Sequence, residues 1–97
     1  MNELLLVASI AERDTLRYTP AGIPIVSGTL HHGSQQTEAG IARQVEFEIA
    51  ALAAGDISGR FADAELGAVH RFRGFLARKS RNSKALVFHI IDFSGVA

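Results

Sequence analysis

The sequence has no cysteine and no tryptophan, and only one tyrosine and two prolines, among its 97 residues. Without cysteine, the chain has no disulfide scaffold, no thiolate zinc site and no cysteine nucleophile. Its apolar runs, such as Leu4 to Ala8, are far shorter than the roughly 20 residues that cross a bilayer. We therefore expect a soluble, cytoplasmic protein without a membrane partner.

The rest of the composition is that of a folded chain. Hydrophobic residues make up 47% of the sequence and charged residues 21%, a balance that excludes a disordered tail. The length fits one small domain and hardly two. We expect residues 1–97 to form a single domain around one hydrophobic core.

The formal net charge is zero only as a sum. Residues 1–70 carry nine acidic and four basic side chains, whereas residues 71–97 carry six basic and one acidic. Four of these basic side chains lie between Arg78 and Lys84, separated by serine and asparagine, which favour turns. The segment is predicted to be a basic loop tip that faces a polyanion. From charge alone, a solvated loop whose cations only keep the protein soluble fits equally well.

Hydrophobic alternation, interrupted by turn-forming residues, predicts five strands. They cover residues 4–11, 23–32, 41–54, 68–77 and 85–93. Between the first two strands, Pro20 presets φ and Gly22 tolerates a positive φ, which predicts a tight turn. The polar segment from Gly33 to Gly40 lacks periodicity and is predicted to be a flexible loop.

A short helix is predicted between the third and fourth strands. Asp56 is expected to cap it, and Ile57 and Phe61, four residues apart, are expected to face the core. A short five-stranded sheet avoids open edges best by curling into a barrel, and the small barrel with a helix at this point is the OB-fold. The predicted fold is therefore an all-β, five-stranded OB-fold barrel. In this fold the loop between strands four and five, which holds the basic segment, contacts ligands.

The aromatic residues are divided between core and surface. Phe47, Phe75 and Phe88 occupy alternating strand positions and are predicted in the barrel interior. Tyr18, in the first turn, and Phe72 are the candidates for exposed rings that stack on bases.

Arg43 is the one charge on the apolar face of the third strand. Because an unpaired buried guanidinium is costly, Arg43 is expected either to reach nucleic acid from the strand's open end or to pair with an acid across a dimer. A position in water at the strand edge is the alternative.

No catalytic or metal site is predicted. His31 and His32 are neighbours on a strand and point to opposite faces, so they lack the spacing of metal ligands. Glu46 and Glu48 share a strand face, but nothing nearby suggests a nucleophile. The chain is thus expected to be neither an enzyme nor a cofactor-binding protein. Apolar residues on both faces of the first and last strands exceed what a small barrel covers and predict a homodimer.

Several short motifs stand in a particular order along nearly the whole chain. They are Asn2-Glu3-Leu4, Arg17, Thr19-Pro20-Ala21-Gly22-Ile23-Pro24, Leu30-His31-His32, Glu38-Ala39-Gly40, Arg43-Gln44, Gly74-Phe75 and Lys79-Ser80-Arg81-Asn82-Ser83-Lys84. In this order and spacing the sequence resembles the bacterial single-stranded-DNA-binding proteins, and among them the primosomal replication protein N (PriB) family.

The resemblance implies a homodimeric accessory protein of replication restart that binds single-stranded DNA. It also implies a restart helicase as a partner and, in some bacteria, a helicase-loading protein. By position, Arg17 and the cations of the late loop resemble the family's DNA-contacting residues. The predicted nucleic-acid-binding residues are Arg17, Tyr18, Arg43, Arg78, Lys79, Arg81 and Lys84.

The sequence departs from the family pattern in three places. Glu46 stands where the family has an exposed stacking tryptophan, Gly33 stands where a basic residue is sometimes found, and the basic loop is shorter. Because stacking is weakened and attraction to phosphates remains, we predict weak, salt-sensitive DNA binding.

Two other functions stay open at this point. The first is an OB-fold protein-interaction module with little nucleic-acid affinity, favoured by the zero net charge and the acidic face of the third strand. The second is an RNA- or oligosaccharide-binding OB domain, although the lack of exposed aromatic stacks argues against sugars.

Overall fold

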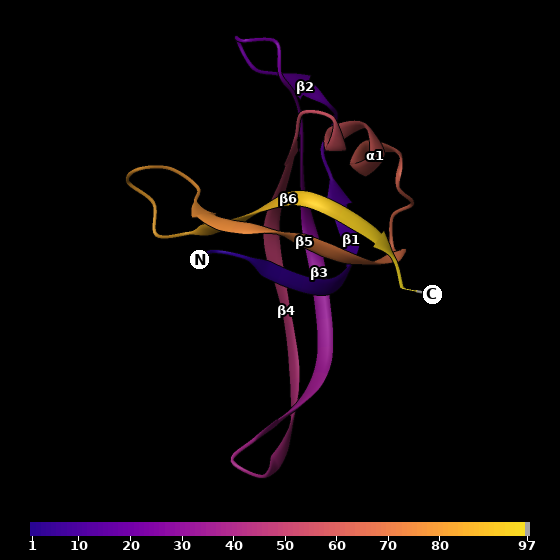
Figure 1. The fold of residues 1–97 in the computed structure, drawn as a ribbon, viewed down its shortest axis with the longest axis vertical. Coiled ribbons are helices and arrows are strands. Elements are labelled where there is room, and N and C mark those ends of the chain that lie inside the picture. The colour runs from indigo at the N-terminus through magenta and orange to yellow at the C-terminus, as the bar shows by residue number, and fades with distance from the viewer. Residues whose placement is uncertain (97) are drawn as a thin grey trace.

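A computed structural model describes residues 1–96, in which strands curl around a core beside one short helix (Figure 1). The elements are β1 (Leu4–Arg13), β2 (Arg17–Tyr18), β3 (Pro24–Glu38), β4 (Ile41–Ala54), α1 (Ile57–Asp63), β5 (Val69–Arg78) and β6 (Leu86–Gly95). Within these described residues, no helix is long and apolar enough to cross a membrane.

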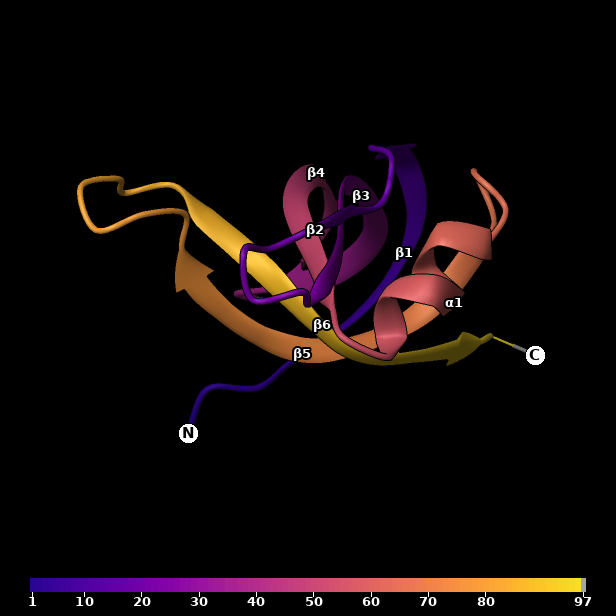
Figure 2. The same ribbon diagram turned by 90° about the horizontal axis from the view of Figure 1, so that it is seen from above.

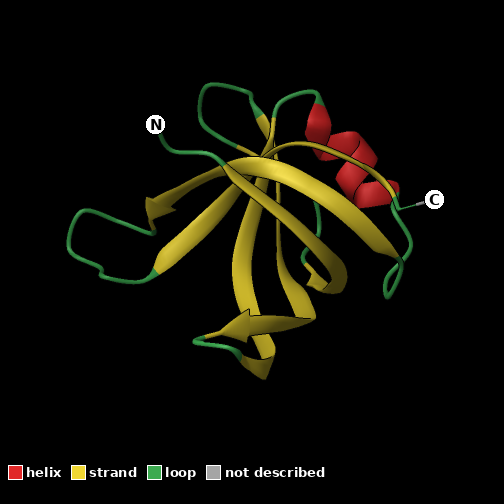
Figure 3. Ribbon diagram, turned by 60° about the horizontal axis from the view of Figure 1, so that its bottom comes forward, coloured by secondary structure: helices red, strands yellow, loops and turns green. Residues whose placement is uncertain are grey.

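The sheet closes on itself. Its strand order is β1-β5-β6-β4-β3-β2, and an additional β1–β3 pairing closes the five long strands into a barrel. All neighbouring pairs are antiparallel except β4 and β6, which run parallel with Ala50 opposite Val87. Figure 3 shows the curled strands with the helix beside them. The predicted OB-fold is confirmed, with the two-residue β2 as an addition to the five long strands.

The core is built from alternate residues of every long strand and from one helical side chain. The buried hydrophobic residues are Leu6, Ala8, Ile10, Val26, Leu30, Ala51, Ala53, Phe61, Phe72, Phe88, Ile90 and Phe93. Phe61 of α1 lies edge-on to Phe72 and Phe93, with ring centroids 6.4 and 6.3 Å apart. The prediction that Phe61 faces the core from a short helix is confirmed.

Two arginines fix α1 to the barrel. Arg13 donates hydrogen bonds to the carbonyl oxygens of Phe61, at 3.0 Å, and of Ala64. Arg60 donates to Asp92 Oδ1 at 3.0 Å and to the carbonyl oxygen of Phe93 at 2.6 Å. The hydrogen bond from Arg60, followed by one from the backbone of Phe93, lowers the pKa of Asp92 below its usual value. Both arginines are therefore committed to structure.

The predicted helix cap is wrong in its detail. Asp56 has helical dihedral angles and its side chain makes no capping hydrogen bond. Instead, the hydroxyl of buried Ser58 donates to the carbonyl oxygen of Gly55 at 2.6 Å. Gly55 has a φ of +79°, so it ends β4 and turns the chain into the helix.

The predicted turn after β2 is confirmed. Gly22 has a φ of +82°, and its N–H donates to the carbonyl oxygen of Thr19 at 2.8 Å. The hydroxyl of Thr19 also accepts a hydrogen bond from the N–H of Ile23 at 3.1 Å. These bonds pair Arg17 with Ile25 and aim β2 along one end of β3.

Residues 33–40, predicted to be a flexible loop, instead form the last part of β3 and the turn that follows it. β3 continues to Glu38 and pairs with β4 throughout, so that the two form a long arm at the bottom of Figure 1. Ala39 and Gly40, with φ of +53° and +78°, close it by a tight two-residue turn. The arm has water on both faces, and residues 33–38 lack the alternation that marks a half-buried strand.

Two of the aromatic predictions on β5 are wrong. Phe72 is fully buried rather than exposed, and Phe75 is 36% exposed rather than in the core. The two residues do lie on opposite faces, as expected from alternation. The face of Phe75 also carries Arg71 and Arg73, and those charges indicate the outer side.

Phe47 is also wrongly predicted in the core, whereas Phe88 is buried as expected. Phe47 is 40% exposed because it pairs with His32, just beyond the point where β1 stops pairing with β3. Its ring lies 5.0 Å from the imidazole of His32, which is fixed by hydrogen bonds with Val7 O and Ser34 Oγ. At Phe47 the β3–β4 arm has left the barrel, so no core lies beneath this residue.

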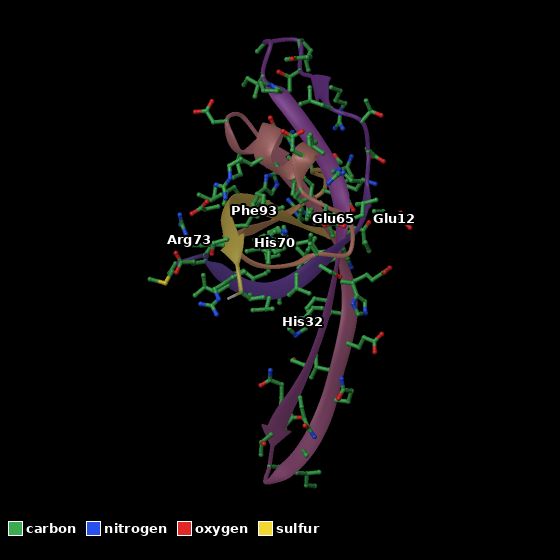
Figure 4. The ribbon with its side chains drawn as sticks, turned by 90° about the vertical axis from the view of Figure 1, so that its right-hand side faces the viewer. Glu12, His32, Glu65, His70, Arg73 and Phe93 are labelled. Carbon is green, nitrogen blue, oxygen red and sulfur yellow. The ribbon has the colours of Figure 1, made fainter. Side chains whose placement is uncertain are left out.

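His70 has two buried ring nitrogens without a hydrogen-bond partner among the described residues. Its ring lies edge-on to Phe72 and Phe93, with centroids 5.8 and 5.1 Å apart, and Figure 4 shows it next to Phe93. A buried polar group without a partner costs about 1–3 kcal/mol.

His70→Leu is therefore expected to raise the free energy of unfolding by about 1 kcal/mol, since it removes the unpaired nitrogens at little change in volume. Urea unfolding measures the difference. His32→Leu, which removes bonded nitrogens, is the control and should bring no stabilisation. A His70→Leu protein less stable than the wild type would contradict this account of His70.

Candidate nucleic-acid interface

A groove with a volume of about 660 Å³ crosses the outer face of the barrel between β2 and the β5–β6 loop. Its lining residues are Asp14, Arg17, Ile25, Ser27, Gly28, Ala50, Ala51, Leu52, Arg78, Lys79, Ala85, Leu86, Val87 and His89. The floor is made of small and apolar side chains of β3, β4 and β6. Three cations lie around it, Arg17 at one end and Arg78 with Lys79 at the other.

The fold divides the cations of the chain into two groups. Among the described residues, Arg43, Arg60 and Arg73 lie within 4.0 Å of an acidic oxygen, and Arg13 binds helix carbonyls. No acidic partner is within that distance of the remaining cations of residues 1–96, which are Arg17, Arg71, Arg78, Lys79, Arg81 and Lys84. Five of these six line the groove or lie in the adjoining loop.

The β5–β6 loop presents its cations to solvent. The N–H of Lys79 donates to the carbonyl oxygen of Ala85 at 2.9 Å and closes the base of the loop. Inside it, Ser83 Oγ accepts from the N–H of Ala85 at 3.1 Å. Figure 2 shows the loop extending from the barrel on the side away from α1. Arg81 and Lys84 are exposed there, as the sequence predicted for a basic loop tip.

The residues of β2 lie at the other end of the groove. Arg17 donates a hydrogen bond to Ser27 Oγ at 3.2 Å, which directs the guanidinium over the face of β3. Tyr18 is 67% exposed and does not contribute to the groove lining. Arg17 therefore joins the loop cations around one groove, while Tyr18 lies beside it.

Arg43 lies on the arm, apart from the groove. It donates a hydrogen bond to Glu38 Oε1 at 2.6 Å across the arm's turn, and both side chains are exposed. Arg43 thus pairs with an acid of its own chain and lies in water, which agrees with the alternative of an exposed edge position; a pairing across a dimer is not what is observed. A contact of Arg43 with nucleic acid stays a prediction.

The groove floor continues onto the arm as an acidic surface. Along β4, Glu46 and Glu48 share the strand face of Ala50 and Leu52, which line the groove. Glu46 Oε1 lies 3.1 Å from His31 Nε2 on β3. A polyanion leaving the groove along the arm meets these carboxylates and is repelled.

Glu46→Lys is expected to strengthen binding of single-stranded DNA about fivefold in 0.1 M salt and to add about 0.7 to the salt slope, the effect of one further phosphate contact. Anisotropy titration of a labelled oligothymidine measures both quantities. Glu65→Lys, with the same charge change in the α1–β5 loop, is the control. Equal affinities of the two variants would show that the arm is not on the path of the DNA.

Sequence reasoning missed several groove residues. Ile25, Ser27, Leu52 and His89 are small, apolar or weakly polar, and each lies on a strand face that alternation alone leaves unassigned to groove or solvent. A signal was available in the predicted topology, because the face between the two ligand-contacting loops of an OB-fold must be lined by outward residues of the strands between them.

Among residues 1–96, no three histidine, aspartate or glutamate side chains gather as metal ligands would. The arrangement of the groove fits an extended anion. Cations at both ends can hold different phosphates of one strand, and the floor between them is apolar enough for bases.

Known proteins share both the sequence and the fold. Residues 2–92 match a family described as another single-strand binding protein family. The Replication restart protein PriB of Nitrosomonas europaea is 37% identical over 91 residues, which cover 94% of this chain and 84% of that protein.

Two solved structures resemble this chain in three dimensions. The protein PriB of Ralstonia solanacearum superimposes with a TM-score of 0.92 and 47% identity, covering 100% of this chain and 99% of that one. A single-stranded DNA binding protein of Thermus aquaticus superimposes with a TM-score of 0.76 at 20% identity, over 100% of this chain and 51% of that one, and so shares the fold. The resemblance seen in the motifs is thereby confirmed, and the chain belongs to the PriB family of single-strand binding proteins.

Proposed function

We infer that this chain binds single-stranded DNA through the groove and the β5–β6 loop, as a non-enzymatic accessory protein of replication restart in the cytoplasm. One observation carries the proposal. Five of the six cations that have no acidic partner among the described residues gather at the groove and its loop, between the two ligand-contacting loops of an OB-fold. The names of the related proteins support the same role.

In this proposal the cations hold the sugar-phosphate backbone. Arg17, Arg78 and Lys79 contact phosphates in the groove, and Arg81 with Lys84 extends the contact along the loop. Such contacts carry no sequence information, so binding is nonspecific and decreases with salt. In this proposal the groove is a binding surface, and any catalytic step belongs to a partner such as a restart helicase, which this chain would stimulate, or a helicase-loading protein.

Competition tests the choice of ligand. A labelled oligothymidine bound at low salt should be displaced by unlabelled single-stranded DNA more effectively than by double-stranded DNA or an oligosaccharide. Stronger displacement by RNA would favour the RNA-binding alternative. Absence of oligothymidine binding at low salt would favour the protein-interaction module and contradict the proposal.

The proposal includes a homodimer. The N-terminal half of β1 pairs with β5 on one edge, but pairing with β3 begins only at Ser9. Residues 4–8 therefore have no strand partner on the other edge among the described strands, where the carbonyl oxygen of Val7 is bonded to the side chain of His32. Around this edge, Leu5 and Val7 are 62% and 41% exposed. A second copy pairing its own β1 there would satisfy the edge and cover the apolar side chains.

The double variant Leu5→Glu/Val7→Glu is therefore expected to sediment as a monomer, with half the mass of the wild type, because charge on this face opposes its burial. Analytical ultracentrifugation gives the mass directly. Leu66→Glu, an equally apolar exposed position in the α1–β5 loop, should leave the dimer intact. A wild-type monomer, or a dimeric double variant, would contradict the assignment of the interface.

A further inference from the structure

The groove contains one aromatic ring among the described residues that line it, the imidazole of His89. Phe61, Phe72, Phe88 and Phe93 are buried in the core. Phe47 lies on the opposite face of β4 from the groove residues Ala50 and Leu52, since odd and even positions of a strand alternate. His89 is thus the ring that a ligand in the groove would meet.

His89 is held flat by a neighbour. Phe75 lies directly opposite it on β5, and the two rings stack with centroids 4.8 Å apart and an angle of 5° between their planes. Phe75 covers one side of the imidazole, while the imidazole itself lines the groove. The backing ring restricts the rotamers of His89, so little conformational entropy remains to be lost on binding.

The surroundings of His89 leave room for a planar ligand. The strand register places Leu52 beside it on β4 and Ser27 beyond Leu52 on β3. The next row contains Ala50, Val87 and Ala77, whose side chains are short. A base that lies on His89 therefore meets a flat apolar surface, with Arg78 and Lys79 at the same end of the groove to hold the adjoining phosphates.

We propose that the stacked pair His89 and Phe75 is a base-stacking platform, on which one unpaired nucleobase lies while the groove cations hold its phosphates. The inference rests on the proposed function and adds to it a contact that electrostatics alone does not supply. It also provides an aromatic platform in a chain whose acidic arm offers none on the groove side.

An abasic oligonucleotide separates stacking from charge. We expect wild-type protein to bind an oligothymidine more tightly than a deoxyribose-phosphate oligomer of the same length without bases, since both carry the same phosphates. His89→Ala should weaken oligothymidine binding about five- to tenfold, the lower part of the range for one stacked base, and should leave abasic binding unchanged. His89→Phe should retain the difference, because it keeps a ring on Phe75.

Two further variants test whether a loss of binding results from a change in folding. Phe75→Ala removes the backing ring from an exposed site and should also weaken oligothymidine binding selectively. Ile91→Ala, at an exposed position outside the groove on β6, the strand of His89, should change neither ligand's binding.

The possible failures are distinguishable. Wild-type protein that binds both oligomers equally, or a folded His89→Ala protein that binds oligothymidine as the wild type does, would overturn the platform and leave the DNA-binding proposal standing. Wild-type protein that binds neither oligomer at low salt would overturn the proposed function and, with it, the platform.

Discussion

Reversing the three loop cations in Lys79→Glu/Arg81→Glu/Lys84→Glu should reduce the affinity for single-stranded DNA by about 100-fold or more in 0.1 M salt. Each lost phosphate contact lowers the association constant about fivefold at this salt concentration, because log K changes by about 0.7 per contact for each tenfold change in salt. The introduced carboxylates repel the strand in addition. Anisotropy titration of a labelled oligothymidine measures the loss.

The triple variant should remain folded. All three side chains are exposed and lack acidic partners among residues 1–96, so exchanging them breaks no ion pair of the fold. The charge-conserving variant Lys79→Arg/Arg81→Lys/Lys84→Arg is the matched control and should bind like the wild type. Unchanged affinity of the charge-reversed protein would show that the loop does not contact DNA.

Gly74→Ala should have the largest effect on stability, lowering the free energy of unfolding by about 3 kcal/mol or more, at the upper end of overpacking. A Cβ at this position would lie 1.9 Å from the carbonyl oxygen of His89 and 2.6 Å from Phe88 Cε1. The first of these atoms is backbone, so β6 itself must move. The close approach coincides with the bulge where β5 and β6 change register.

Urea unfolding compares Gly74→Ala with Gly33→Ala, whose added methyl group would meet nothing within 4 Å. The control should lie within about 0.5 kcal/mol of the wild type. Because the clash falls on the residue that carries the imidazole, any folded Gly74→Ala protein should also lose part of its oligothymidine affinity. A Gly74→Ala protein as stable as the wild type would contradict the tight packing of β5 on β6.

The element order was predictable from sequence because strands and turns leave local signals. Alternation located every long strand of the barrel, and the Gly22 turn followed from its need for a positive φ. The arm was not predictable in this way. Its β3 half, residues 33–38, is exposed and has no apolar side to repeat, so these residues look like a loop although they pair in full with β4.

The charged residues of the site could be predicted from the sequence, but the residues that form the floor of the groove could not. Arg17 and the cations of the β5–β6 loop are far apart in sequence, but the topology brings them to one groove. They were predictable because both segments belong to the ligand-contacting loops of an OB-fold. Whether His89 and Phe75 are exposed depends on which face of their strands points outward. Packing across the barrel decides this, and the local alternation of residues does not distinguish the two faces.

The most direct test of the central claim is the salt dependence of oligothymidine binding. If cations around the groove hold phosphates, log K should fall linearly with log salt concentration in the wild type, by about 0.7 for each contact. The slope should be shallower by about 2 in the charge-reversed loop variant, the sum of its three lost contacts. Binding that does not change with salt, or equal slopes for the two proteins, would contradict the account.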